Sequence, residues 1–368
     1  MKPERLVAAL ALCYALYSCE RHDDIPAGPE ENFRVEFHDM ESVEAPASIE
    51  GTYILNNGNW GSNDANVGIY DPASKSFAPK AFYAANQMNL GDLGQDIIGV
   101  GDAVYIAVNG SKTVFATDKS MRLNVQIDAF KGQTRLSPRC LASYGSKLYV
   151  TYYEGYVFEI DESGKTFRAA TVGNSPEGLA VADGCLYVAN SGGALYPDYE
   201  KTVSVVSLET FTEISTIEVN PNPIKVEASS DGSYVYVSSF GDYAANPAKL
   251  QVVRTATGEV SDLDYAAVSA VTSSDDMLYI LCGGYDAGWN PLPGTVYRHD
   301  MKNNQPLGAF VTDGTVLLDA YSISAARDGY VYVGCSDYVT NGDVYVFTPE
   351  GKLHDRFDSQ GLNPLKAY

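Results

Sequence analysis

The sequence is poor in basic residues. Over 368 residues, 25 Lys and Arg stand against 47 Asp and Glu, which gives a formal net charge of −22. Proteins that bind nucleic acid need Lys and Arg against the phosphates, so this balance argues against that class. A strongly acidic chain suits instead a soluble domain displayed outside a cell.

Histidine is scarce as well. The chain has four histidines: His22, His38, His299 and His354. The first two lie near the N-terminus, and the last two fall in patterns expected for outer strands. No pairing of a nucleophile with a histidine base can be drawn from these positions, and carboxylates such as Asp92 show no calcium-loop spacing. The sequence therefore predicts a protein that is not an enzyme and assigns no residue to a metal, while calcium on carboxylates such as Asp92 and Asp96 stays an open alternative.

Long hydrophobic runs are missing except at residues 6–17. That run is shorter than the roughly 20 residues that span a bilayer, and it fits the core of a secretory signal peptide. The residues that end at Cys19 resemble a bacterial lipobox, in which cleavage precedes a lipid-modified cysteine. Ordinary cleavage beside an unmodified cysteine is the alternative. We expect a lipoprotein signal peptide at 1–18, an acidic tether at 19–48 with a short strand at 33–37, and a folded domain at 49–368.

The charged segment directly after Cys19 points to a location. Residues 20–24 read Glu-Arg-His-Asp-Asp, which resembles the export signal that sends lipoproteins of Bacteroides-type bacteria to the outer face of the outer membrane. Multiple acyl chains on one cysteine give durable anchoring. We therefore expect a lipid-anchored protein that faces the cell exterior.

Closely spaced cysteine pairs are also absent. The chain has six cysteines and no CxxC motif, and Cys13 is expected to leave with the signal peptide. The remaining cysteines lie in or beside apolar strand patterns, where buried free thiols are favoured over a disulfide. These residues are Cys140, Cys185, Cys282 and Cys335.

Amphipathic helices are absent, and a repeat takes their place. Seven segments share one pattern: a Tyr, then alternating apolar residues, then small and polar ones. A turn pair such as Asp183-Gly184 precedes each segment, and short strand patterns lie on both sides. Four short antiparallel strands every 40 to 50 residues are typical of a propeller blade. The sequence therefore predicts an all-β, seven-bladed β-propeller. The pattern tyrosines are Tyr53, Tyr105, Tyr149, Tyr187, Tyr236, Tyr279 and Tyr332.

The two ends of the domain predict how the ring closes. The first repeat, at Tyr53, has no strand pattern before it that could serve as an inner strand. The chain ends with residues 363–368, which resemble the opening strand of a blade. We expect this C-terminal strand to complete the first blade and remove an exposed edge.

Two families of loops are expected to meet on one face of the disc. One family follows each tyrosine-containing strand, and the other leads into the first strand of the next blade. These loops are rich in aromatic and amide side chains, which suit a ligand platform, although loop aromatics could simply cap the channel. The predicted ligand-binding residues are Asn59, Trp60, Asp92, Gln95, Asp96, Asn109, Arg135, Tyr152, Tyr153, Asn190, Tyr196, Phe240, Tyr243, Tyr285, Trp289 and Tyr338.

The segment from residue 51 onward resembles the YncE-like (DUF5074-type) surface propeller lipoproteins of Bacteroidetes. The most specific part lies in the first 60 residues, where NNGNWGSNDANVGIYDP precedes LGDLGQDIIGVGDAVYIAVNG. The BtuG-like members of that family capture cobalamin and hand it to BtuB, a TonB-dependent transporter. The resemblance thus implies a corrinoid as bound ligand rather than cofactor, and a BtuB-like outer-membrane partner. Arg135 is then a candidate contact for the corrinoid phosphate.

A different class of function uses the same features. A rim of aromatic residues would also serve a surface-layer or adhesive protein that binds a glycan or a protein partner. Binding of cyanocobalamin, as opposed to retention on a glycan column, separates the two hypotheses.

Overall fold

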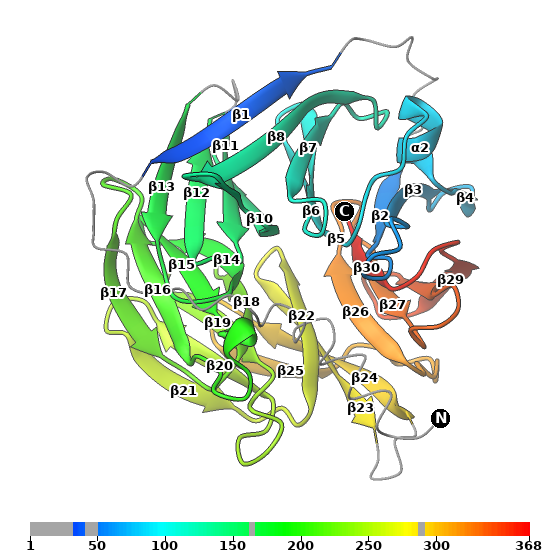
Figure 1. Ribbon diagram of the computed structural model, residues 1–368. Helices are drawn as coiled ribbons and strands as arrows, with labels where there is room; N and C mark the ends of the chain where they lie inside the picture. The colour runs from blue at the N-terminus through cyan, green and yellow to red at the C-terminus, as the bar shows by residue number, and fades with distance from the viewer. Residues whose placement is uncertain (1–31, 41–50, 162–165, 286–290) are drawn as a thin grey trace.

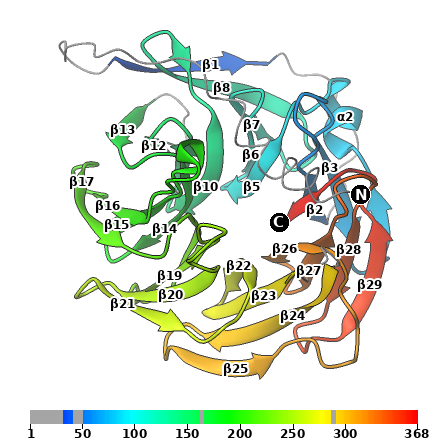
Figure 2. The ribbon, with the colours of Figure 1, turned by 60° about the horizontal axis from the view of Figure 1, so that its bottom comes forward.

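In the computed structural model, seven antiparallel sheets stand around a central channel (Figure 1). The structure describes residues 32–40, 51–161, 166–285 and 291–368. The predicted all-β, seven-bladed propeller is confirmed. Figure 2 shows the same ring after a turn of 60°. The expected signal peptide and Cys19 lie outside the described residues.

The predicted closure of the ring is also confirmed. β30 pairs antiparallel with β2 and forms the innermost strand of the first blade, so strands from both ends of the domain share one sheet. Blade 1 consists of β30 (Pro364–Ala367), β2 (Thr52–Asn56), β3 (Asn66–Asp71) and β4 (Ser76–Ala78), followed by the short helix α2 (Ala81–Asn86).

Blades 2 to 4 follow in chain order, each beginning with its innermost strand. Blade 2 contains β5 (Gly94–Val100), β6 (Ala103–Val108), β7 (Thr113–Thr117) and β8 (Leu123–Lys131), and β9 (Thr134–Arg135) pairs with β8. Blade 3 contains β10 (Pro138–Tyr144), β11 (Lys147–Tyr152), β12 (Tyr156–Ile160) and β13 (Phe167–Thr171). Blade 4 contains β14 (Pro176–Ala182), β15 (Cys185–Asn190), β16 (Thr202–Ser207) and β17 (Glu213–Glu218), with the 3-10 turn η1 (Gly193–Leu195) after β15.

Blades 5 to 7 complete the ring in the same order. Blade 5 contains β18 (Pro223–Ala228), β19 (Tyr234–Ser239), β20 (Lys249–Arg254) and β21 (Glu259–Leu263). Blade 6 contains β22 (Val268–Ser274), β23 (Met277–Tyr285), β24 (Pro291–Asp300) and β25 (Gln305–Ala309). Blade 7 contains β26 (Ala320–Ala325), β27 (Val331–Cys335), β28 (Asp343–Phe347) and β29 (Leu353–Asp358).

The core of the molecule is divided among the junctions between blades. Seven clusters of buried apolar residues each combine side chains of two neighbouring blades. The pattern tyrosines lie on the second strand of each blade, where six are buried and Tyr279 is half-buried. Some hydroxyls bond to the next blade: Tyr53 donates to the carbonyl of Lys119 at 2.7 Å and Tyr236 to that of Met301 at 2.9 Å. The repeated Tyr therefore packs blade against blade and satisfies its own polar atom.

The short strand expected at 33–37 is present as β1 (Phe33–Asp39), and it lies along the outer edge of blade 2. β1 pairs antiparallel with β8, and Figure 1 shows it at the rim of the disc. Its Phe33 ring contacts Tyr156 and Phe158 of blade 3 at centroid distances of 5.1 and 5.4 Å. The strand covers an edge that would otherwise offer free backbone groups.

Two further features complete the fold. The four remaining cysteines are free, with Cys282 and Cys335 buried and Cys140 and Cys185 half-buried. Within the described ranges, no helix has the length and apolar character needed to cross a membrane.

Candidate binding site in the central channel

One hydrogen bond, repeated in all seven blades, brings the two loop families to the same face. A backbone N–H at or near the end of each second strand donates to the carbonyl of a residue that leads into an innermost strand, at 2.8–3.1 Å. Both ends of this bond therefore lie at the same mouth of the channel, as expected. The seven bonds run from Asn57 to Asn363, Asn109 to Leu93, Tyr153 to Ser137, Ser191 to Ser175, Phe240 to Asn222, Gly283 to Ala267 and Ser336 to Asp319.

The innermost strands begin with a distorted backbone. Six of the seven are preceded by a non-glycine residue in the left-handed region, such as Asn222 (φ 59°) and Asn363 (φ 57°). Each innermost strand then shifts its register against the second strand near its first residues. Such bulges re-aim side chains. In most blades two successive residues, such as Gln95 with Asp96 and Ile224 with Lys225, consequently line the channel.

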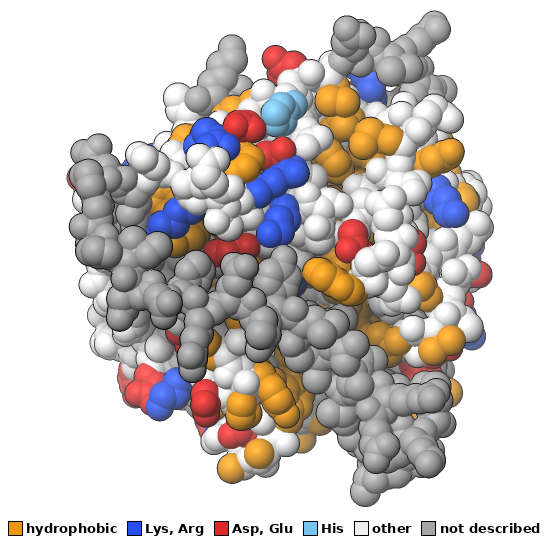
Figure 3. All heavy atoms as spheres, viewed as in Figure 1, with side chains coloured by type: hydrophobic (Ala, Val, Ile, Leu, Met, Phe, Trp, Pro, Cys, Tyr) orange, Lys and Arg blue, Asp and Glu red, His pale blue; other side chains and the backbone are white. Residues whose placement is uncertain are grey.

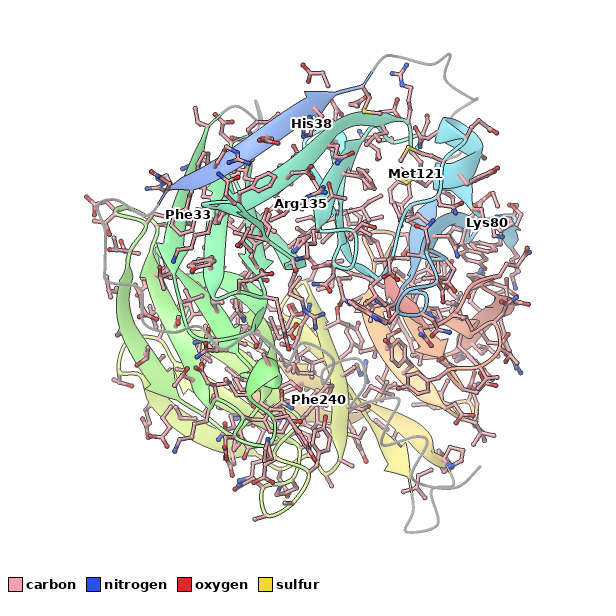
Figure 4. All side chains as sticks on the ribbon, viewed as in Figure 1. Phe33, His38, Lys80, Met121, Arg135 and Phe240 are labelled. Atoms are coloured by element: carbon pink, nitrogen blue, oxygen red, sulfur yellow. The ribbon has the colours of Figure 1, made fainter. Side chains whose placement is uncertain are left out.

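The channel opens into a cavity of about 1610 Å³. This volume exceeds the roughly 300–1,000 Å³ of most small-molecule sites. Figure 3 shows the face seen in Figure 1, with Lys and Arg side chains gathered near β8, where Figure 4 labels Arg135. In Figure 4, Phe240 lies on the other side of the centre of the ring. Nine of the predicted residues line the cavity: Asn59, Trp60, Gln95, Asp96, Asn109, Tyr153, Phe240, Tyr243 and Tyr338.

Two predicted ligand contacts are wrong. Tyr152 is 1% exposed and packs its ring against Phe158 in the core between blades 2 and 3. Asn190 is fully buried, and its Nδ2 donates to the hydroxyls of Thr202 and Ser204. Both are the last residues of their strands, and their side chains turn into the blade instead of the channel.

Three further predicted residues, Asp92, Arg135 and Tyr196, lie outside the cavity lining. Asp92 accepts the backbone N–H of Gly61 at 3.0 Å, which holds the loop that carries Trp60. Arg135 forms an ion pair with Asp128.

Tyr196 stands at the rim, 55% exposed, in edge contact with Tyr199, which in turn contacts Tyr243 of the cavity wall. Tyr285 is the last residue of β23, and Trp289 lies outside the described residues.

The amide-rich loop at residues 56–66 divides into structural and exposed parts. The buried side chain of Asn56 donates to Asn66 Oδ1 at 3.0 Å and to the carbonyl of Ser359 at 3.1 Å. Asn57 donates to the carbonyl of Gly94 at 2.8 Å. Asn59 and Trp60 follow on the cavity wall, and Trp60 is 47% exposed. The first amides thus hold the blade junctions, while the tip of the loop faces the channel.

The inner wall carries a group of charged residues, most of which were not among the predicted ligand-binding residues. Arg139 makes two bonds to the Glu177 carboxylate, at 2.9 and 2.7 Å. Lys366 forms an ion pair with Asp96. Lys225 has its closest carboxylate oxygen, on Glu227, at 3.6 Å. The sequence did indicate that these residues line the channel. Arg139, Lys225 and Lys366 occupy the second or third position of their strands, as Gln95 and Asp96 do.

Burial and neighbouring charges together set the pKa values of this wall. Burial raises the pKa of the Glu177 carboxyl, and the charge of Arg139 opposes that rise. Burial lowers the pKa of Lys225, but Glu227 and Asp96 outweigh it and raise that pKa above its usual range, so the amine stays charged. Burial, helped by Asp96 and Glu177, raises the pKa of Cys140 to about 12, so this thiol stays protonated at neutral pH. Among the described residues, no group of three or more His, Cys, Asp or Glu could hold a metal ion.

Comparison with known proteins gives a family and a fold. Residues 50–347 match the model of a protein family described as a domain of unknown function, DUF5074. No curated protein matches. The hydrazine synthase of Kuenenia stuttgartiensis is similar in structure, with a TM-score of 0.54 and 17% identity over 70% of this chain and 77% of that chain. The computationally designed protein Ika8 has a TM-score of 0.54 and 13% identity, over 89% of this chain and 92% of its own. At these identities the likeness concerns the fold alone.

Proposed function

This chain belongs to the DUF5074 family, and on that premise we propose that it captures a corrinoid, a ligand of the vitamin B12 type, in its central channel. The proposal places the protein on the outer face of the outer membrane, held by lipid on Cys19. There it would deliver the corrinoid to a TonB-dependent, BtuB-like transporter. Its role is binding and transfer, without catalysis.

The observation that carries the proposal is the size of the cavity together with its lining. A corrinoid is a wide, flat macrocycle fringed with amide groups, and it needs a larger site than most small molecules. The cavity of about 1610 Å³ provides the room. Aromatic walls such as Trp60, Phe240 and Tyr243 give contact area at low entropic cost.

The polar groups of the wall match the fringe of such a ligand. Within the described residues, the side-chain amides of Asn59 and Gln95 have no protein hydrogen-bond partner, and both line the cavity. Both amides are half-buried. The hydroxyl of Tyr153 is buried in the same wall, beside Ser175. A ligand rich in amide donors and acceptors would pair with the amides of Asn59 and Gln95.

One observation favours a second candidate, a glycan or protein ligand. Tyr196, Tyr199 and Tyr243 form a chain of edge contacts across blades 4 and 5, with centroids 5.8 and 6.0 Å apart. Exposed aromatic rings of this kind also stack on sugars. The chain lies at one side of the rim and reaches the cavity wall at Tyr243, so an adhesive role would use the mouth of the channel and not its deep part.

Calorimetry with the secreted part of the chain, residues 20–368, tests the proposal. Cyanocobalamin should bind saturably with one molecule per chain, and the purified complex should keep the pink colour through gel filtration. Absence of heat and of colour would refute the corrinoid proposal. Retention on a glycan column in that case would support the adhesive role instead.

A further inference from the structure

Lys225 differs from Arg139 and Lys366, the cations paired with carboxylates on the same wall, because its ion pair is longer than hydrogen-bond distance. It lies on β18, in the bulged start of the strand, and lines the cavity. Its Nζ is 3.6 Å from the nearest carboxylate oxygen, on Glu227, which is beyond hydrogen-bond distance. The other oxygen of that carboxylate, Oε2, accepts the hydroxyl of Ser273 at 2.6 Å. The attraction between Lys225 and Glu227 is therefore electrostatic at this distance, and the N–H donors of the ammonium can turn to another acceptor.

The neighbouring cations are already engaged. Arg139 is paired with Glu177 through two bonds, and Lys366 is paired with Asp96. These three cations balance the carboxylates of Asp96, Glu177 and Glu227, and the other charged residues of the lining, Lys112, Glu154 and Asp319, add one net negative charge. The net charge of the wall therefore does not attract an anion, so the local availability of donors decides where an anion binds.

Space is available beside Lys225. The next innermost strand, β22, contacts β18 and presents small neutral residues to the cavity, among them Ser269 and Ala270. The strand after it, β26, continues with Ser322 and Ser324. One side of the channel is therefore charged, and the other is neutral and formed largely by small side chains, with Tyr321 among them, which leaves room for a bulky ligand.

We propose that Lys225 is the anchor of an anion-binding subsite in the channel, which accepts a phosphate or phosphodiester group of the bound ligand. The inference rests on the proposed function, because in a corrinoid this group is the phosphodiester of the nucleotide loop. Lys225 replaces Arg135 as the proposed phosphate contact, since Arg135 is paired with Asp128 and lies outside the cavity lining. The amide fringe then faces Asn59 and Gln95 near the mouth.

A pair of corrinoids tests this assignment. Cyanocobalamin carries the phosphodiester, and dicyanocobinamide lacks it. By calorimetry, Lys225→Met should weaken cyanocobalamin binding by about 10- to 100-fold, as expected for one charge-assisted hydrogen bond, and should change cobinamide binding by less than about twofold. Lys225→Arg should restore most of the affinity. Equal losses for the two ligands, or no loss for either, would overturn the proposal.

A matched control and a second readout keep the two proposals separate. Lys249→Met removes a lysine of the same blade that is paired with Asp262 outside the cavity, and it should change neither affinity. If the unsubstituted protein binds neither corrinoid, the proposed function fails, and inorganic phosphate then tests the subsite alone. At matched ionic strength, phosphate should raise the thermal midpoint of the unsubstituted protein above its value in chloride, and should not do so for Lys225→Met or Lys225→Gln. The same rise in all three proteins, or in none, would overturn the subsite.

Discussion

The side chain of Asn363 donates a hydrogen bond to the carbonyl oxygen of Gly58 at 3.0 Å, across 305 positions of the sequence. Its Oδ1 accepts the hydroxyl of Ser336 at 2.6 Å, and its backbone carbonyl accepts the N–H of Asn57. Asn363 therefore joins the last blade, the closing strand and the first loop of the mouth. It does so with a φ of 57°, a conformation that Asn adopts more readily than most residues.

Asn363→Ala should lower the free energy of unfolding by about 2–4 kcal/mol. The substitution removes two buried hydrogen bonds, and Ala fits the left-handed backbone less well than Asn. Urea unfolding followed by circular dichroism measures the change. Asn303→Ala is the control, because its bonds are exposed and reach only Asp300, three positions away. If the two substitutions destabilise the protein equally, Asn363 does not secure the closure.

His299 should make stability depend on pH. This residue is 2% exposed, its Nε2 lies 2.9 Å from the Oδ1 of Asn304, and its Nδ1 lies 3.1 Å from the hydroxyl of Tyr265. Since Asn304 Oδ1 can only accept, Nε2 carries the proton and Nδ1 accepts from Tyr265. Burial lowers the pKa of the imidazole below its usual 6.5. The neutral ring is therefore the native form.

The sign of the pH effect follows from that shift. Above pH 6.5 the ring is neutral in the folded and the unfolded chain, so the contribution of His299 to stability is complete. As the pH falls below 6.5, the unfolded chain takes up a proton first, and stability decreases until the folded pKa is passed. Urea unfolding between pH 8 and 5 should show a smaller decrease for His299→Gln than for the unsubstituted protein. Identical slopes for the two proteins would contradict the assignment.

The fold could be predicted because its signals are local and repeated. The tyrosine pattern and the turn pairs before it recur seven times, and each copy is one hairpin. Asp183-Gly184, for example, connects β14 to β15 with both residues at positive φ, as a tight primed turn requires. The closing strand was recognisable because residues 363–368 repeat the opening pattern of the other blades.

The side chains of the channel were harder to predict, because one residue of register decides which way each one points. Tyr152 ends its strand and is buried, while Tyr153 is the next residue and lines the cavity. An error of one position in a strand end moves a side chain to the opposite face. The bulges create the same difficulty at Lys225 and Lys366, where strict alternation would place only every second residue in the channel.

Removal of β1 should weaken the propeller without unfolding it. A chain that begins at residue 42 lacks the seven residues that pair with β8, so that strand becomes an exposed edge. We expect a lower free energy of unfolding and self-association at high concentration, measured by urea unfolding and by gel filtration with light scattering.

A point variant separates packing from edge exposure. Phe33→Ala removes the ring that contacts Tyr156 and Phe158, at a cost of about 1–3 kcal/mol for a half-buried aromatic side chain. It keeps the strand and should remain monomeric. Asp39→Ala, at the exposed end of β1, should change little. A shortened chain as stable as the full one would show that β1 adds nothing to the fold.

Trp60 and Tyr144 provide a matched test of which face binds the ligand. Both are large aromatic side chains and are 47% and 59% exposed. Trp60 lies on the cavity wall, whereas Tyr144 ends β10, the innermost strand that begins at the mouth with Pro138, and so lies toward the other face. Trp60→Ala should weaken cyanocobalamin binding by about 10-fold or more, since buried aromatic contacts dominate most binding sites. Tyr144→Ala should leave the affinity unchanged. Calorimetry on both variants measures the affinity for cyanocobalamin. A loss of affinity caused by Tyr144→Ala alone would place the binding site on the opposite face of the disc.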